Sequence, residues 1–184
     1  MKDPPALLAS VWILDRVPHI FTDVRAYAIW REELARRIEV DPSSLFVTGS
    51  AAFGVSLNPN KNYRFFTDKS DIDVAVVSGH HFTLAWRTLR NLGSRRYGLS
   101  STAAASVKDH VSNYIYWGTI ATDKILHLLP FSAQWSSALD HMRTIDPTLG
   151  RTVKVRIYND LDSLRGYQAS NLKGLKTARL SAKE

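Results

Sequence analysis

The spacing of apolar residues in the first half of the chain predicts one helix and two strands. Residues 23–39 repeat apolar side chains every three or four positions, as a helix requires, with Asp23 or Thr22 placed to cap its start. The run LFVT at 45–48 is typical of a short strand. The β-branched run IDVAVV at 72–77 has the pattern of a central strand buried on both faces.

Helical spacing dominates the second half of the chain. A polar, Asn-rich connection at 56–70 first predicts a long surface loop or hairpin. The segment 152–158 alternates with the period of a strand, whereas 124–129 fits either a strand or a helix. The predicted helices cover 82–92, 101–117 as one helix or a pair, 133–145, and the chain from 161 onward. Strands alternating with helices predict an α/β or α+β sheet with helices packed against it.

Length and composition limit the organisation of the chain. Its 184 residues, 45% of them hydrophobic, suffice for one core, so we expect a single domain. Its parts are an N-terminal helical segment at 1–44, a core at 45–160 and a C-terminal helix at 161–184. Cysteine is absent, which excludes disulfides, thiolate metal sites and cysteine nucleophiles.

Charge and hydropathy bear on partners and location. A net charge of +7, from 24 Lys and Arg against 17 Asp and Glu, favours contact with polyanions, although many ordinary domains are equally basic. The apolar run at 6–14 is shorter than the ~20 residues that cross a bilayer. Residues 1–5 lack the basic start of a signal peptide. We therefore expect a soluble, cytoplasmic protein without membrane contact.

Two carboxylates stand at the start of the second strand. Residues i and i+2 of a strand project from one face about 6.6 Å apart, so Asp71 and Asp73 are expected to point at one spot. Their repulsion is relieved by a shared cation, and hard oxygen ligands suit Mg²⁺ or Mn²⁺ held together with substrate phosphates. The alternative is a turn capped by Ser70 and Asp71, with Asp73 facing water.

The first strand ends in a pair of small residues. Gly49 and Ser50 turn directly into further small side chains, which exposes backbone N–H groups that, with the Ser50 hydroxyl, suit phosphate oxygens. Glycine is needed where the backbone must approach a ligand closely. Any strand-to-helix turn also favours these residues, so the pair alone is a weak signal. The Gly-Ser pair followed by Asp71 and Asp73, in this order, is a more specific signal than the pair alone.

With these residues in place, the sequence resembles the nucleotidyltransferase superfamily that shares the DNA polymerase beta-like catalytic core. The resemblance lies in LFVTGSAAFG at 45–54 and SDIDVAVV at 70–77. It implies an α+β fold, with a small mixed β-sheet flanked by helices. It also implies that Gly49 and Ser50 hold nucleotide phosphates, and that Asp71 and Asp73 bind two magnesium ions, which align the α-phosphate for attack.

The family usually adds a third carboxylate on a later strand, and here the chain departs from the pattern. The middle of the strand at 152–158 holds Lys154 and Arg156 instead of an acid. Asp160 at the end of that strand is the candidate third catalytic carboxylate, but it also reads as the N-cap of the following helix. Asp162 and Asp123 are weaker substitutes.

Basic residues near these motifs are candidate nucleotide ligands. Arg156 is expected to pair with Asp71 or Asp73 or to hold a phosphate, unless it is a lone arginine on an edge strand. Lys61 and Arg64, in the loop before the aspartates, would close over a bound nucleotide.

Aromatic residues are abundant. Tyr114, Tyr116 and Tyr167 are the candidates for contact with a nucleobase. The tryptophans fall on helical stripes, which predicts core positions for Trp12, Trp30, Trp86, Trp117 and Trp135.

The resemblance implies a Mg²⁺- or Mn²⁺-dependent nucleotidyltransferase that moves a nucleoside monophosphate from a triphosphate such as ATP to a hydroxyl acceptor. The acceptor is left open between a protein, an RNA end, a second nucleotide and a small molecule, in a setting of bacterial antiviral defence or a toxin–antitoxin pair. The rival is a degenerate nucleotide-binding or partner-neutralising module, which the missing acid favours. A third reading is a basic RNA-binding domain without metal.

Overall fold

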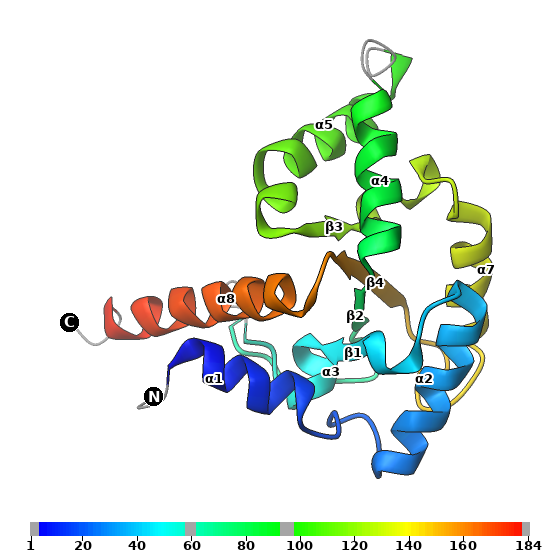
Figure 1. Ribbon diagram of the computed structural model, residues 1–184. Helices are drawn as coiled ribbons and strands as arrows, with labels where there is room; N and C mark the ends of the chain where they lie inside the picture. The colour runs from blue at the N-terminus through cyan, green and yellow to red at the C-terminus, as the bar shows by residue number, and fades with distance from the viewer. Residues whose placement is uncertain (1–3, 58–61, 93–97, 182–184) are drawn as a thin grey trace.

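The computed structural model describes residues 4–57, 62–92 and 98–181, with 173–181 described by their backbone alone. It has an α+β architecture, in which helices flank a small mixed sheet of four strands (Figure 1). In the described parts of the chain, every helix is too short or too polar to cross a bilayer.

The elements follow one another as the apolar pattern predicts in most places. The strands are β1 (Leu45–Thr48), β2 (Ile72–Val77), β3 (Thr119–Ala121) and β4 (Val153–Tyr158). The α-helices are α1 (Pro5–Ala9), α2 (Val24–Ile38), α3 (Gly49–Phe53), α4 (Gly79–Asn91), α5 (Ser101–Asp109), α6 (Thr122–Ile125), α7 (Ser132–Met142) and α8 (Leu161–Ser181). Single π or 3₁₀ turns are η1 (Ser10–Leu14), η2 (Pro42–Ser44), η5 (His110–Tyr114), η6 (Ile115–Trp117) and η7 (Leu126–Leu128).

The sheet has the strand order β1-β2-β4-β3. β1 runs antiparallel to β2, β2 runs parallel to β4, and β3 runs antiparallel to β4. The register pairs Thr48 with Asp73, Asp73 with Lys154 and Ala75 with Arg156. Because paired residues project from the same face, a row of polar side chains from three strands meets on one side of the sheet.

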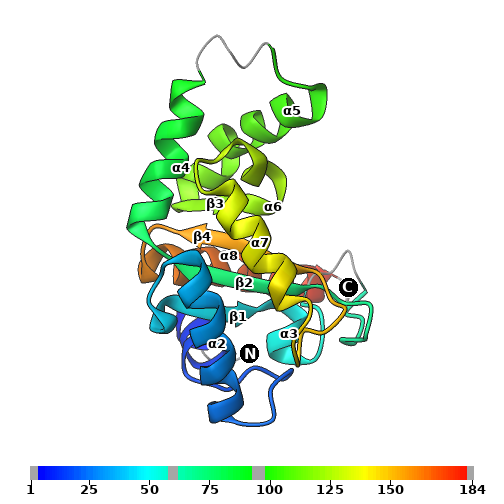
Figure 2. The same ribbon diagram turned by 90° about the vertical axis from the view of Figure 1, so that its right-hand side faces the viewer.

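One face of the sheet builds the main core. Leu45, Val74, Val155 and Ile157 are buried there against α2, α4 and α7, which lie over this face (Figure 2). Trp135 of α7 is fully buried in the same cluster. This is the continuous apolar packing that the β-branched strands require.

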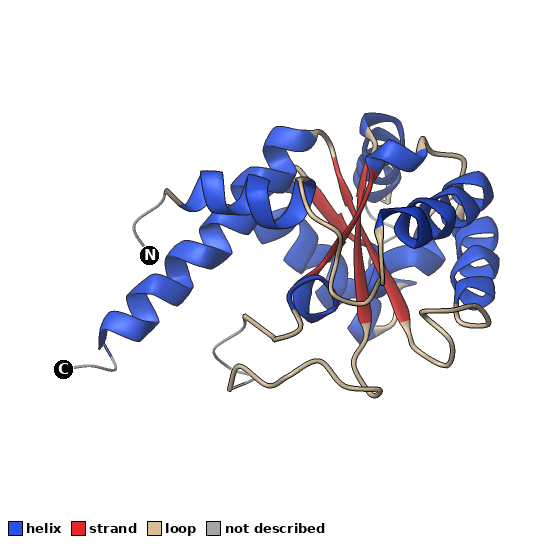
Figure 3. Cartoon of the chain, turned by 90° about the horizontal axis from the view of Figure 1, so that it is seen from below, coloured by secondary structure: helices blue, strands red, loops and turns tan. Residues whose placement is uncertain are grey.

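The opposite face is covered by the two ends of the described chain. α1 and α8 pack side by side on this side of the sheet (Figures 1 and 3). Its small apolar cluster consists of Ala75, Tyr158 and Leu164, with Phe46 and Tyr167 packed against it. The sheet is therefore sandwiched between an extensive core and a thinner cover.

The predicted helix at 23–39 is confirmed as α2, and Asp23 is its cap, since its side chain accepts a hydrogen bond from the Ala26 N–H at 2.8 Å. The strands predicted at 45–48, 72–77 and 152–158 are confirmed as β1, β2 and β4. The ambiguous segment 124–129 is helical as far as Leu128, within α6 and η7, and Leu129 after it is extended.

Two expectations from the pattern need correction. β3, just before α6, was not predicted, because three residues are too few for alternation to show. The expected strand at 72–77 is not buried on both faces along its length, since Asp73 is exposed. The loop 56–70 begins as a hairpin, with Val55 bridged to Phe65.

Candidate functional site

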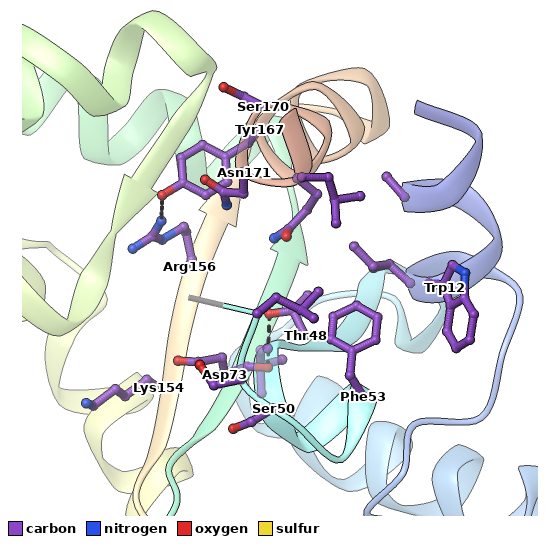
Figure 4. A pocket seen from close by; sticks show the side chains of 18 of the residues that line it. Trp12, Thr48, Ser50, Phe53, Asp73, Lys154, Arg156, Tyr167, Ser170 and Asn171 are labelled. Carbon is purple, nitrogen blue, oxygen red and sulfur yellow. Dashed lines mark hydrogen bonds between the residues drawn. The ribbon is translucent and has the colours of Figure 1, made fainter. Parts of the chain in front are cut away.

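A pocket of about 1070 Å³ opens on the thinly covered face, between α1, η1, α3, α8 and the strands β2 and β4 (Figure 4). One side of it is polar, and its lining there is Thr48, Gly49, Ser50, Asp73, Asp123, Lys154 and Arg156. The other side is apolar, and Trp12 and Phe53 lie beside each other there. Such a combination of an apolar wall with a few convergent polar groups is typical of a ligand site.

Gly49 and Asp73 meet closely at the floor of the pocket. Gly49 follows the end of β1 and has a φ of +63°, and a Cβ at this position would lie 2.8 Å from Asp73 Oδ2. The preceding Thr48 is in register with Asp73, and its hydroxyl donates to the Asp73 carbonyl oxygen at 3.3 Å. Glycine is therefore required twice, for its backbone conformation and for the space beside the carboxylate. Ser50 lines the same part of the pocket.

Asp71 lies beside Lys154 of β4. The Lys154 Nζ is 2.5 Å from Asp71 Oδ2, and both side chains are about two-fifths exposed, at 40% and 41%. The hydrogen bond to Asp71 raises the pKa of Lys154, aided by the negative charges of Asp71, Asp73 and Asp123 and opposed by burial. Arg156 was expected to pair with Asp71 or Asp73 or to hold a phosphate. The register instead brings Lys154 to this position, since Lys154 is paired with Asp73 across the two strands.

Arg156 lines the pocket further along β4. Its Nη1 donates a hydrogen bond to the Tyr167 hydroxyl, and its guanidinium carbon lies 5.0 Å from the Tyr167 ring centroid and 5.1 Å from that of Tyr114. Tyr114 is held in turn by Lys124, whose Nζ lies 3.1 Å from the Tyr114 hydroxyl. Within the described residues, Arg156 has no carboxylate within ion-pair distance. Its positive charge is thus stabilised by aromatic rings and remains available to an anionic ligand.

Asp160 does not reach the pocket. Its Oδ1 accepts from the Ser163 backbone N–H at 2.7 Å, and its Oδ2 accepts from Asn159 Nδ2 at 2.8 Å. The hydrogen bond from the Ser163 backbone is the main reason that the pKa of Asp160 is lowered. The candidate third carboxylate is therefore the N-cap of α8, the alternative that the sequence had left open.

The other sequence candidates are distributed around the site. Asp123, at the start of α6, does line the pocket. Arg64 is exposed in the loop and is not part of the lining, while Lys61 lies outside the described residues. Asp162 is exposed on α8 and pairs only weakly with Arg165, at 3.5 Å.

Sequence reasoning missed the aromatic wall of the pocket. Trp12 was expected in the core, but it is 45% exposed, and Arg16 stacks on its ring at 4.6 Å. α8 adds Gln168 and Asn171 to the lining. A helical stripe indicates a packed face but does not say what that face packs against. Trp12 lies in η1, and its ring packs near that of Phe53 of α3, with the two centroids 6.3 Å apart.

The oxygen donors of the site fit one divalent ion better than two. Asp71 and Asp73 offer the hard oxygens that Mg²⁺ and Mn²⁺ prefer, and Gly49 leaves room beside Asp73 Oδ2. No cluster of three or more His, Asp or Glu side chains suited to a metal occurs among the described residues. β4 supplies Lys154 and Arg156 where a second ion would need an acid, so the expected two-ion arrangement does not fit these residues.

Comparison of the chain with models of protein families, with curated proteins and with solved structures finds no match.

Proposed function

We propose that the pocket binds a nucleoside triphosphate and that the protein is a nucleotidyltransferase with a polymerase beta-like core. It would transfer a nucleoside monophosphate to a hydroxyl acceptor. The observation that carries the proposal is the close approach of Gly49 to Asp73, where an added Cβ would lie 2.8 Å from the carboxylate, on the floor of a pocket that also presents Ser50 and Arg156. The glycine turn and the basic side chains beside it suit the phosphates of a nucleotide, and the carboxylate suits the metal ion that accompanies them.

The polar side of the pocket would hold the triphosphate. Arg156 lacks a carboxylate partner in the described structure, so its guanidinium can bind phosphate oxygens without breaking an ion pair. The Ser50 hydroxyl would donate a further hydrogen bond. Asp73 would hold the Mg²⁺ or Mn²⁺ ion, which when bound neutralises phosphate charge and polarises the α-phosphate.

The apolar side of the pocket has room for the base. Trp12 and Phe53 lie with their ring centroids 6.3 Å apart across the pocket from Arg156 (Figure 4). Aromatic rings stack on any nucleobase and contribute affinity without strict sequence preference. Asn171 of α8 offers an amide that would hydrogen-bond to a base edge.

The acceptor in this proposal is a hydroxyl of a protein, an RNA end, a second nucleotide or a small molecule. The proposed setting, the cytoplasm of a bacterium in antiviral defence or a toxin–antitoxin pair, rests on the resemblance of the two motifs alone.

One observation favours a second candidate function. The ion pair of Lys154 with Asp71, and the absence of an acid at positions 154 and 156 of β4, favour a nucleotide-binding or partner-neutralising module that binds without transfer. Such a module would use the same pocket. The two functions differ in chemistry, and one experiment separates them.

The test is to incubate the protein with Mg²⁺ and each α-labelled nucleoside triphosphate, alone and with cell extract. We expect covalent label on an acceptor, and we expect Asp73→Asn to reduce it at least about 100-fold, because the carboxylate contributes charge at the reacting phosphate. The matched control is Asp140→Asn, on the exposed surface of α7, which should retain full transfer.

Binding of a fluorescent triphosphate analogue is measured in parallel. Binding without label transfer would establish the module. Neither binding nor transfer with any triphosphate would contradict both candidate functions.

A further inference from the structure

Lys154 stands among three carboxylates. Its Nζ is 2.5 Å from Asp71 Oδ2, its strand position is directly beside Asp73, and it lines the pocket together with Asp123. Asp73 and Asp123 line the pocket and Asp71 lies beside them on Lys154, and carboxylates gathered in this way repel one another unless a cation lies among them. The described structure supplies that cation from the chain itself.

We infer that the Lys154 ammonium replaces one divalent cation, so that the site takes a single metal ion through Asp73. The inference rests on the proposed metal site, but its test needs neither a nucleotide nor catalysis. It assigns Lys154 as a positioning residue that sets the number of ions.

The geometry supports this exclusion. A Mg²⁺ ion on Asp71 Oδ2 would lie at about 2.1 Å from that oxygen, in the region that the ammonium at 2.5 Å already holds. Two cations on one carboxylate oxygen repel strongly at such separations, and Lys154 cannot diffuse away because it is anchored in the middle of β4. The Asp73 Oδ2 faces the backbone of Gly49, where an added Cβ would lie 2.8 Å from it.

The chain offers a matched control in a second lysine–aspartate pair. Lys124 Nζ is 2.5 Å from Asp109 Oδ2, and the exposures of these two side chains, 36% and 33%, are close to those of Lys154 and Asp71. Lys124 does not line the pocket. Removing its charge therefore reproduces the loss of an ion pair without freeing a carboxylate of the site.

The experiment is titration of the full chain with Mn²⁺ alone, with free Mn²⁺ followed by electron paramagnetic resonance. We expect the wild type to bind one ion per chain, and no binding at all would contradict the inference as two tight ions would. Lys154→Gln should bind Mn²⁺ at least about tenfold more tightly, because Asp71 loses its counter-charge. Lys154→Arg, which keeps the charge, and Lys124→Gln should behave as the wild type. Adding Asp71→Asn to Lys154→Gln should abolish the gain.

Two tight ions in the wild type, or unchanged affinity in a folded Lys154→Gln, would overturn the inference. If Lys154→Gln fails to fold, as judged by circular dichroism, the stoichiometry of the wild type and of Lys154→Arg still decides it. Failure of nucleotide binding would remove the proposed function but leave the Mn²⁺ result intact, so the two failures are distinguishable.

Discussion

The two faces of the sheet use the same four strands for different purposes. On β4, Val155 and Ile157 are buried in the main core, while Lys154 and Arg156 project into the pocket from the alternate positions. Because neighbouring residues of a strand point to opposite faces, core residues and pocket residues alternate along β4. Substitutions on the two faces should consequently affect different measurements.

The largest effect is expected on the core face. Ile157→Ala removes a fully buried side chain and should lower the free energy of unfolding by about 2–5 kcal/mol, through lost burial and the cavity left behind. Lys154→Gln, three residues earlier on the opposite face, should change it by only about 0–1 kcal/mol, because a partly exposed ion pair contributes little. Urea denaturation measures both. Equal losses would mean that the two faces do not differ in this way.

A smaller effect on stability, with a large effect on binding, is expected at the pocket floor. Gly49 and Gly150 both have positive φ, at +63° and +71°, so alanine at either should cost about 1–2 kcal/mol of stability. A Cβ at Gly150 meets nothing within 4 Å, whereas one at Gly49 meets Asp73. Gly49→Ala alone should therefore weaken triphosphate binding, by at least about tenfold. Triphosphate affinity is measured by fluorescence titration. Equal affinity in Gly49→Ala and Gly150→Ala would show that Gly49 is not part of the ligand site.

The smallest effect on stability is expected from His110, which packs beside the edge strand β3. His110 is fully buried, its Nδ1 is 2.7 Å from the Ser106 carbonyl, and its Nε2 accepts from the Ala121 N–H at 3.0 Å. Burial lowers the pKa of His110 below its ordinary 6.5, and the nearby charge of Lys124 adds to this, whereas that of Asp109 opposes it. The folded state therefore resists protonation.

The sign of the pH dependence follows from that lowered pKa. The contribution of neutral His110 is present above pH 6.5 and is lost as the pH falls toward the folded-state pKa, since the unfolded chain takes up the proton first. Unfolding should accordingly become easier as the pH falls below about 6.5, the ordinary pKa of histidine. In His110→Gln the slope of stability against pH should be shallower. An unchanged slope would assign the dependence to other groups, such as His81, whose pKa burial also lowers.

Most of the fold could be predicted because the spacing of apolar residues within each segment indicates its secondary structure. α2, with its cap, and the strands β1, β2 and β4 follow from apolar spacing alone. β3 could not be predicted, because three residues carry too little pattern and its pairing with β4 is a long-range event. The segment 124–129 was ambiguous because a short apolar run fits a strand as well as a helix.

The candidate site was only partly predictable. Gly49 and Asp73 meet as their order along the chain suggested, because β1 and β2 are antiparallel neighbours. That Lys154, and not Arg156, pairs with Asp71 depends on the exact register of two parallel strands far apart in sequence, which no local pattern encodes. The role of Trp12 in the pocket likewise depends on long-range packing.

One wall of the pocket is formed where α1 and α8 pack side by side. All four strands lie between α1 and α8 in the sequence, so they are synthesised before α8. Until α8 leaves the ribosome, the face of the sheet that it covers is exposed to water. The pocket is thus completed late in biosynthesis. A nascent chain remains unable to capture a small molecule in it until this helix has docked.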